Sequence, residues 1–176
     1  MLLQRLVEYA DRQDDLAPPL YTKAWVRYVI ELDRDGNLLN PEPLDLAETG
    51  NRRGQRRPVP NVQRASAIKP LLLADNAEYT LGLGREKSRP ERVKGCHEAY
   101  MTLLETCAAE TEDPLAKAVL HFLQDDPLSH LDLSEDFDRG DKIVFRVGGM
   151  FPHRQKDVQR FWARHNAPKT TGKKAS

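Results

Sequence analysis

An alternation of hydrophobic and polar residues predicts a strand early in the chain. From Trp25 to Asp33 every second residue is hydrophobic, which is the period of a strand with one buried face. The Asp-Gly pair inside residues 34–37 indicates a hairpin turn. A weaker returning strand is expected over 38–46, where two prolines favour an edge position. The residues expected on the buried face of the first strand are Val26, Tyr28, Ile30 and Leu32.

Most of the remaining chain has the period of helices. Hydrophobic residues three and four positions apart predict a buried helix face. Pro90 suits a first helical turn, and Asp113 followed by Pro114 is typical of an N-cap and the position after it. Residues 143–147 predict a late strand. Helices are expected over 2–12, 90–110, from 114 onward and over 156–165, with a short one near 71–81.

These elements together indicate an α+β domain. We expect a small antiparallel sheet, made of the hairpin and the late strand, packed with about four to five helices and carrying a long basic loop. Residues 1–165 are expected to form one domain, and the polar residues 166–176 a disordered tail.

Composition narrows the class of protein. The 176 residues are 39% hydrophobic and 31% charged, with no hydrophobic run long enough to cross a membrane. Cys96 and Cys107 lie on one predicted helix, too far apart for a disulfide, so we expect reduced thiols and a cytoplasmic protein. No metal-binding spacing and no nucleophile–base pair is readable. We therefore expect no cofactor, no metal ion and no enzymatic activity.

Positive charge is concentrated in one segment. The whole chain has 27 basic and 27 acidic residues, yet residues 50–69 contain six basic residues and no acidic one. Such a local field favours a polyanion, most simply a phosphate backbone. Six phosphate contacts would give a slope of about −5 for log K against log salt. The alternative is a solvated flexible loop. The basic residues are Arg52, Arg53, Arg56, Arg57, Arg64 and Lys69.

Polar side chains that can read base edges follow the arginines. Asn61, Lys69 and Asn76 carry amide and ammonium groups of the kind that contact bases in a groove. The ordinary alternative is turn formation, because Asn favours turns for backbone reasons. A separate acidic segment covers residues 125–141, and its carboxylates do not have the spacing of a calcium-binding loop. We interpret this segment either as a solvated face or as a docking site for a basic partner.

Several stretches in order carry a resemblance to a known family. They are MLLQRLVEYADR, APPLY, ELDRDGNLL, SAIKPLLLADNAEYTLGLG and KIVFRVGGMFPHRQKDVQRFWARH. Together they resemble the N-terminal part of the large subunit of the type I-C CRISPR surveillance complex, Cascade. Proteins of that family are several times longer, so the chain is expected to be the N-terminal module, which reads the protospacer-adjacent motif.

The resemblance implies a nucleic-acid-binding subunit in bacterial antiviral defence. It would recognise the protospacer-adjacent motif and the backbone of target double-stranded DNA, aid strand opening and help to recruit a helicase-nuclease. The implied partners are target DNA, guide RNA, other Cascade subunits and the helicase-nuclease, with phage inhibitor proteins as further candidates and no membrane.

Two other functions remain open from the sequence. One is a stand-alone RNA-binding protein that uses the arginine-rich loop. The other is a protein-interaction module that uses the acidic segment 125–141.

Overall fold

Four short strands form a mixed sheet at the centre of the molecule, which is described here from a computed structural model. The strand order is β3 (Leu44–Asp45), β2 (Tyr28–Leu32), β6 (Ile143–Val147) and β5 (Ala74–Asp75). The two central strands, β2 and β6, run parallel, and both edge pairings are antiparallel. The α+β prediction is confirmed, but the sheet is mixed rather than purely antiparallel.

The structure describes residues 17–168. The predicted helix over 2–12 lies outside the described residues, as do residues 169–176 of the predicted tail.

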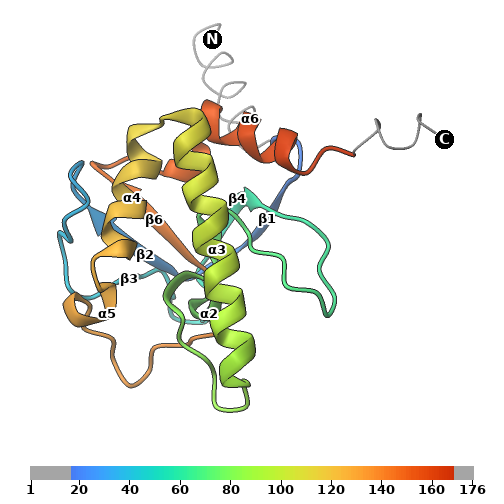
Figure 1. The fold of residues 1–176 in the computed structure, drawn as a ribbon. Helices are drawn as coiled ribbons and strands as arrows, with labels where there is room; N and C mark the ends of the chain where they lie inside the picture. Colours follow the sequence, from blue (N-terminus) through green and yellow to red (C-terminus); the bar gives the residue numbers. More distant parts are fainter. Residues whose placement is uncertain (1–16, 169–176) are drawn as a thin grey trace, which may run out of the picture.

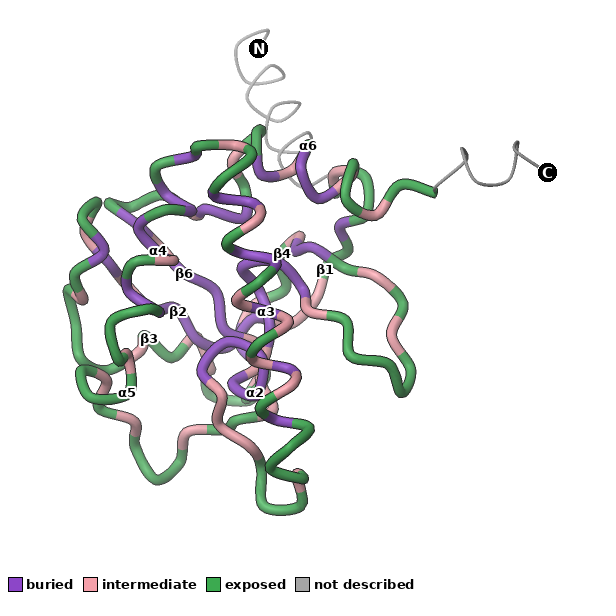
Figure 2. The backbone as a smooth tube through the Cα atoms, viewed as in Figure 1, coloured by how far each residue is buried: buried purple, intermediate pink, exposed green. Residues whose placement is uncertain are grey.

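Helices cover one face of the sheet. They are α2 (Ala77–Leu81), α3 (Pro90–Thr111), α4 (Pro114–Gln124), α5 (Pro127–His130) and α6 (Lys156–His165). The long helix α3 packs against α2, α4 and α6, and it lies with α4 in front of β2 and β6 (Figure 1). Ile30, Phe145 and Tyr100 are fully buried. Figure 2 shows that the backbone at the centre of the molecule is largely buried, in purple. Burying side chains of this kind stabilises the fold by about 1.5–3 kcal/mol each.

The start of α4 forms as its sequence predicts. Asp113 is the N-cap and its carboxylate accepts a hydrogen bond from the Ala116 amide at 3.0 Å, with Pro114 in the first turn. α3 begins at Pro90, as predicted, and buries Cys96 and Cys107 as free thiols.

The predicted strand over 25–33 is two strands separated by Arg27. β1 (Tyr21–Val26) leaves the sheet and pairs antiparallel with β4 (Gln55–Pro60) as a separate two-stranded ribbon. The break follows from Arg27, which is 6% exposed and paired with Asp45 at 3.2 Å and with Asp141 at 3.1 Å. The predicted face was therefore wrong at one position: Val26 lies in a second hydrophobic cluster, not with Tyr28, Ile30 and Leu32.

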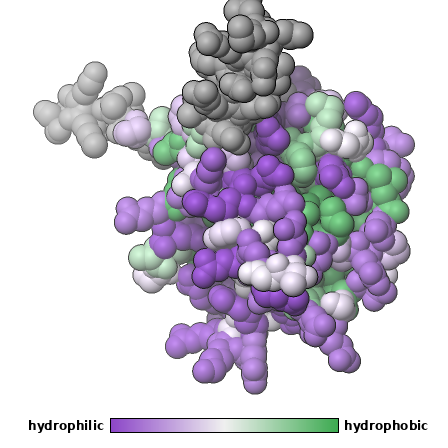
Figure 3. Space-filling model, turned by 180° about the vertical axis from the view of Figure 1, so that it is seen from behind, coloured by the Kyte–Doolittle hydropathy of each residue, from purple (hydrophilic) through white to green (hydrophobic). Residues whose placement is uncertain are grey.

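That second cluster lies on the face of the sheet away from the helices. Val29 and Val144 from the sheet pack there with Val26 and Val59 from the ribbon and with Ala74. Figure 3 views the molecule from behind and shows a mainly hydrophilic surface with smaller hydrophobic patches.

Two other predicted segments are shorter in the structure. The turn over 34–37 forms, with Gly36 at positive φ. The returning segment then makes an isolated antiparallel bridge between Leu38 and Leu32, and forms a strand only at Leu44–Asp45. The helix expected near 71–81 begins at Ala77, because the Asp75 carboxylate binds the Leu71 amide at 2.9 Å and holds the preceding residues in a turn. No helix among the described residues is both long and apolar enough to span a bilayer.

Candidate nucleic-acid interface

The predicted basic loop is a tight turn followed by a strand. Gly50 and Gly54 both have positive φ. An antiparallel bridge between Glu48 and Asn51 closes the turn that contains Gly50. The Asn51 side chain accepts a hydrogen bond from the Arg53 amide at 3.1 Å. This turn holds Arg52 and Arg53 at the surface beside the ribbon.

Strand β4 then places the next two arginines on opposite faces of the ribbon. Arg56 lies opposite Trp25, and Arg57 lies opposite Ala24. Side chains directly opposite each other in an antiparallel pair share a face, and successive side chains alternate between faces. Arg56 therefore lies on the Trp25 face, while Arg57 lies on the face that carries the second hydrophobic cluster.

All four arginines from the turn and the strand are exposed. Within residues 17–168, no carboxylate lies within ion-pair distance of Arg52, Arg53, Arg56 or Arg57. The Arg57 guanidinium donates only to the neutral Gln55 amide oxygen, at 2.7 Å. These four positive charges are thus available to a partner, and we call them the arginine cluster.

A surface groove runs beside the arginine cluster on the sheet face away from the helices. It has a volume of about 580 Å³. Val29, Val144 and Phe151 give it an apolar lining, and Arg57 and Arg154 add positive charge. A third arginine in the groove, Arg146, is paired with Glu31 at 2.6 Å. Of the four members of the arginine cluster, Arg57 lines the groove.

His153 closes one side of this groove as a neutral side chain. It lies in a 3₁₀ turn (η1, Pro152–Arg154) and is 3% exposed. Burial, with the nearby positive charges of Arg154 and Lys142, lowers the pKa of His153 to about 3. Its backbone carbonyl accepts a hydrogen bond from the Tyr21 hydroxyl, so the start of β1 is anchored to this turn.

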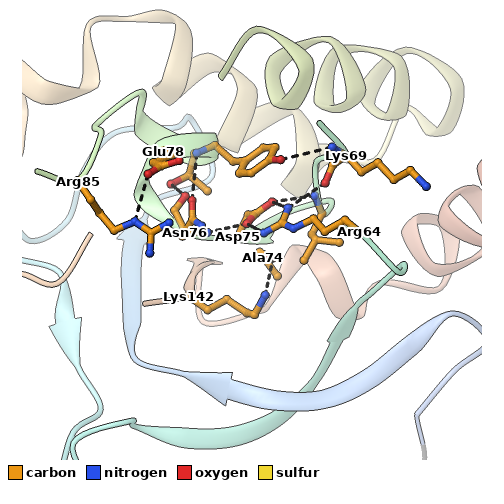
Figure 4. A network of polar contacts seen from close by, with 11 residues as sticks. Arg64, Lys69, Ala74, Asp75, Asn76, Glu78, Arg85 and Lys142 are labelled. Carbon is orange, nitrogen blue, oxygen red and sulfur yellow. Dashed lines mark hydrogen bonds and ion pairs between the residues drawn. The ribbon is translucent and has the colours of Figure 1, made fainter. Parts of the chain in front are cut away.

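Arg64 has a different environment from the arginine cluster. Its guanidinium makes a bidentate ion pair with the fully buried Asp75, at 2.8 Å for both contacts, and also donates to the Lys69 carbonyl (Figure 4). Burial opposes the charge of Arg64, but the Asp75 contact outweighs it and raises the pKa of Arg64. The phosphate-binding role predicted for Arg64 therefore has to compete with a structural role.

Asp75 is the centre of a larger polar network. Its carboxylate also accepts the Leu71 and Asn76 amides, at 2.9 Å and 2.8 Å. The Lys142 ammonium lies nearby and reaches the Ala74 carbonyl at 3.5 Å, and burial lowers the pKa of Lys142. The network fixes the base of the segment that carries the remaining predicted residues (Figure 4).

The three predicted motif-reading residues occupy two kinds of position. Asn61 and Lys69 are exposed on the segment 61–70, which projects from the body beside α3 (Figure 1). The Lys69 ammonium reaches only the Gln63 carbonyl, at 3.4 Å. Asn76 instead caps α2, where its side chain accepts the Tyr79 amide at 3.3 Å. The structure thus brings Asn61 and Lys69 onto one exposed segment and places Asn76 in a helix cap.

Sequence reasoning missed Trp25. Its ring is half-buried and lies between two members of the arginine cluster, 5.9 Å from the Arg53 guanidinium and 6.0 Å from that of Arg56. The strand pattern marked Trp25 only as the first residue of a strand. Its proximity to Arg56 depends on the pairing of β1 with β4, which no local pattern indicates.

The acidic segment 125–141 is held against the body of the protein. Phe137 stacks on Tyr28 with ring centroids 4.4 Å apart, and Asp141 pairs with the buried Arg27. Several of its carboxylates, among them those of Asp125, Asp126, Glu135 and Asp136, remain exposed. Across residues 17–168, no group of three His, Cys, Asp or Glu side chains is placed to hold a metal ion. Burial raises the pKa of the Cys107 thiol to about 12.

Comparison with protein families identifies the class of protein. The family model of the CRISPR-associated protein Csd1 matches residues 3–176, which is nearly the whole chain. The chain therefore belongs to the Csd1 family of CRISPR-associated proteins. A comparison with curated proteins found no significant match. Family membership makes the chain a CRISPR defence protein that works in a complex with other Cas subunits.

Proposed function

We propose that this chain is a DNA-binding part of the large subunit of a type I-C Cascade. The observation that carries the proposal is the arginine cluster: four exposed guanidiniums on one turn and one strand, without an acidic partner among residues 17–168. Guanidinium groups match phosphate oxygens in a bidentate geometry. Membership of a CRISPR-associated family supports a nucleic-acid partner, because RNA-guided complexes of the DNA-targeting kind hold the target duplex in a positively charged channel.

The proposal assigns two tasks to two neighbouring parts of the surface. The arginine cluster would bind the phosphate backbone, which positions the duplex without reading its sequence. The segment 61–70 would approach base edges with Lys69 and Asn61, which reads the short motif. In RNA-guided systems the protein reads this motif while base pairing with the guide reads the rest of the target.

The proposed chain acts without a catalytic site of its own. Strand opening and recruitment of a helicase-nuclease would follow from holding the duplex beside the motif, in concert with the guide RNA and the other subunits. We place this work in the cytoplasm, where the free thiols of Cys96 and Cys107 stay reduced.

Lys69 provides the test of motif reading. In a complex assembled with guide RNA and the other subunits, Lys69→Ala should weaken binding to a motif-bearing duplex by about 1–3 kcal/mol more than to a motif-free duplex. Arg57→Ala is the matched control, since loss of a phosphate contact weakens both duplexes alike. Binding is measured by titration of labelled duplexes. Equal losses on both duplexes for Lys69→Ala would show that Lys69 contacts only phosphate.

A further inference from the structure

Trp25 is a large aromatic side chain that the hydrophobic core does not use. It belongs to neither hydrophobic cluster, although its neighbours in β1, Ala24 and Val26, both pack into the second one. The other tryptophan, Trp162, is 1% exposed, and its indole donates to the Leu20 carbonyl at 2.8 Å. The half-buried ring of Trp25 is therefore available for a contact outside the core.

The surroundings of Trp25 are positively charged. Arg56 is its direct partner across the ribbon, and Arg53 approaches from the glycine turn. Lys23 lies two residues away on β1, exposed and on the same face, because side chains alternate along a strand. Guanidiniums about 6 Å from a ring are at the outer limit of a cation–π contact. Such weak contacts can be exchanged for a phosphate and a base.

An aromatic ring within a basic groove or surface is the arrangement that binds single-stranded nucleic acid. The cations follow the backbone, and the ring stacks on a base, whose π face is present whatever the sequence. Within a duplex the faces of the bases are covered by their neighbours. A ring on a protein surface therefore reaches only an unpaired base.

We propose that Trp25 stacks on an unpaired DNA base while Arg53 and Arg56 bind the adjoining phosphates. This inference rests on the proposed function, because the unpaired base would come from the target duplex when it is opened beside the motif. It adds a site for the separated strand to a surface otherwise assigned to the duplex backbone.

The experiment uses a duplex with a single-stranded overhang and an otherwise identical duplex whose overhang is abasic. Both have the same number of phosphates, so only base contacts differ between them. The whole chain is titrated with each duplex at low salt while tryptophan emission and binding are recorded. We expect the base-bearing overhang to bind about 5- to 150-fold more tightly, the range of stacking energies for one base, and to quench the emission of Trp25.

Two variants separate stacking from a structural role. Trp25→Phe keeps an aromatic ring, so the preference for the base-bearing overhang should persist. Trp25→Leu removes the ring, so both overhangs should bind equally. Emission from the buried Trp162 reports in both variants whether the fold is retained.

Three results would overturn the inference. One is equal binding of the two overhangs by the unmodified chain, and another is a base preference that survives in Trp25→Leu. Both would leave the proposed DNA-binding function intact, because the arginine cluster would still hold the duplex. The third, no binding of any DNA even at low salt, would contradict the proposed function and this inference with it.

Discussion

At the scale of single residues, Arg64 shows that a high density of basic residues in the sequence does not predict which of their side chains are exposed and unpaired. The four arginines between Gly50 and Pro58 are exposed, as their density and lack of neighbouring acids suggest. Arg64 belongs to the same run of sequence, but a carboxylate eleven residues away binds it through two hydrogen bonds. Pairing across that separation depends on the turn before α2, which is not readable from charge alone.

The Arg64–Asp75 pair gives the first prediction of stability. Arg64→Ala leaves the fully buried Asp75 carboxylate without its positive partner, and breaking a buried pair costs several kcal/mol. We expect a loss of about 3 kcal/mol in the free energy of unfolding, at the low end of the usual range because two backbone amides still bind Asp75.

Urea unfolding of the purified chain measures this loss, with Arg56→Ala as the control. Arg56 is exposed and has no carboxylate partner in the described part of the chain, so its removal should change stability by no more than about 0.5 kcal/mol. Equal effects of the two substitutions would mean that Asp75 does not depend on Arg64.

Asn76 and Trp25 mark two other limits of sequence reasoning. Asn76 was predicted to lie near the motif, and an Asn directly before Ala77-Glu78 is also a helix-start signal, which is the role its side chain has. The importance of Trp25 depends on Arg56 lying across the ribbon, a contact between residues far apart in the sequence. The helix cap at Asn76 therefore has a local signal in the sequence, whereas the position of Trp25 has none.

At the scale of elements, signals from prolines and caps predicted the helices well and the ribbon poorly. Pro90, Asp113 and Pro114 act through the backbone of their own turn, so they mark helix starts wherever the helix packs. Pro58 and Pro60 lie in β4, one of the two strands of its ribbon, and an edge position of this kind tolerates proline. The partner strand β1 was hidden because hydrophobic alternation continues through the break at Arg27.

The glycine turn that presents Arg52 and Arg53 gives a prediction at this scale. Gly54 has a φ of +98°, and a Cβ added there would lie 2.1 Å from the Val26 carbonyl oxygen. Gly54→Ala should therefore separate the turn from β1 and weaken DNA binding as well as stability. Gly50 also has positive φ, at +86°, but a Cβ there meets nothing within 4 Å.

Gly50→Ala is accordingly the matched control for backbone strain. Both substitutions carry a cost of about 1–2 kcal/mol for a side chain at positive φ, and Gly54→Ala adds the steric clash. Thermal or urea unfolding of the two variants should show a clearly larger loss for Gly54→Ala. A similar loss in both would mean that the turn moves away from β1 without cost.

At the scale of the whole molecule, the α+β class could be predicted from the sequence, but the order and direction of the strands in the sheet could not. Element types follow from periods of two and of about three and a half residues, which are local. The parallel pairing of β2 with β6 joins residues more than a hundred positions apart, and it brings Val29 beside Val144 at the floor of the groove. The groove is therefore a product of topology, and no stretch of the sequence indicates it.

The whole-molecule distribution of charge explains why a neutral chain can bind a polyanion. The 27 acidic and 27 basic residues cancel overall, but the arginine cluster is separated in sequence from the acidic segment 125–141. Binding therefore depends on the local field near the ribbon rather than on net charge. That field makes the salt dependence of DNA binding the most direct test of the account.

The decisive measurement is the slope of log K against log salt for duplex binding by the whole chain. Each phosphate contact contributes about −0.9 to the slope, so replacing Arg52, Arg53, Arg56 and Arg57 together by Ala should make it less steep by about 3.6. The matched control replaces four exposed basic residues at the start of α3 and before it, namely Lys87, Arg89, Arg92 and Lys94. It changes net charge equally and should leave the slope unchanged. If both variants flatten the slope equally, or if the arginine variant keeps the original slope, the arginine cluster is not the DNA-binding surface.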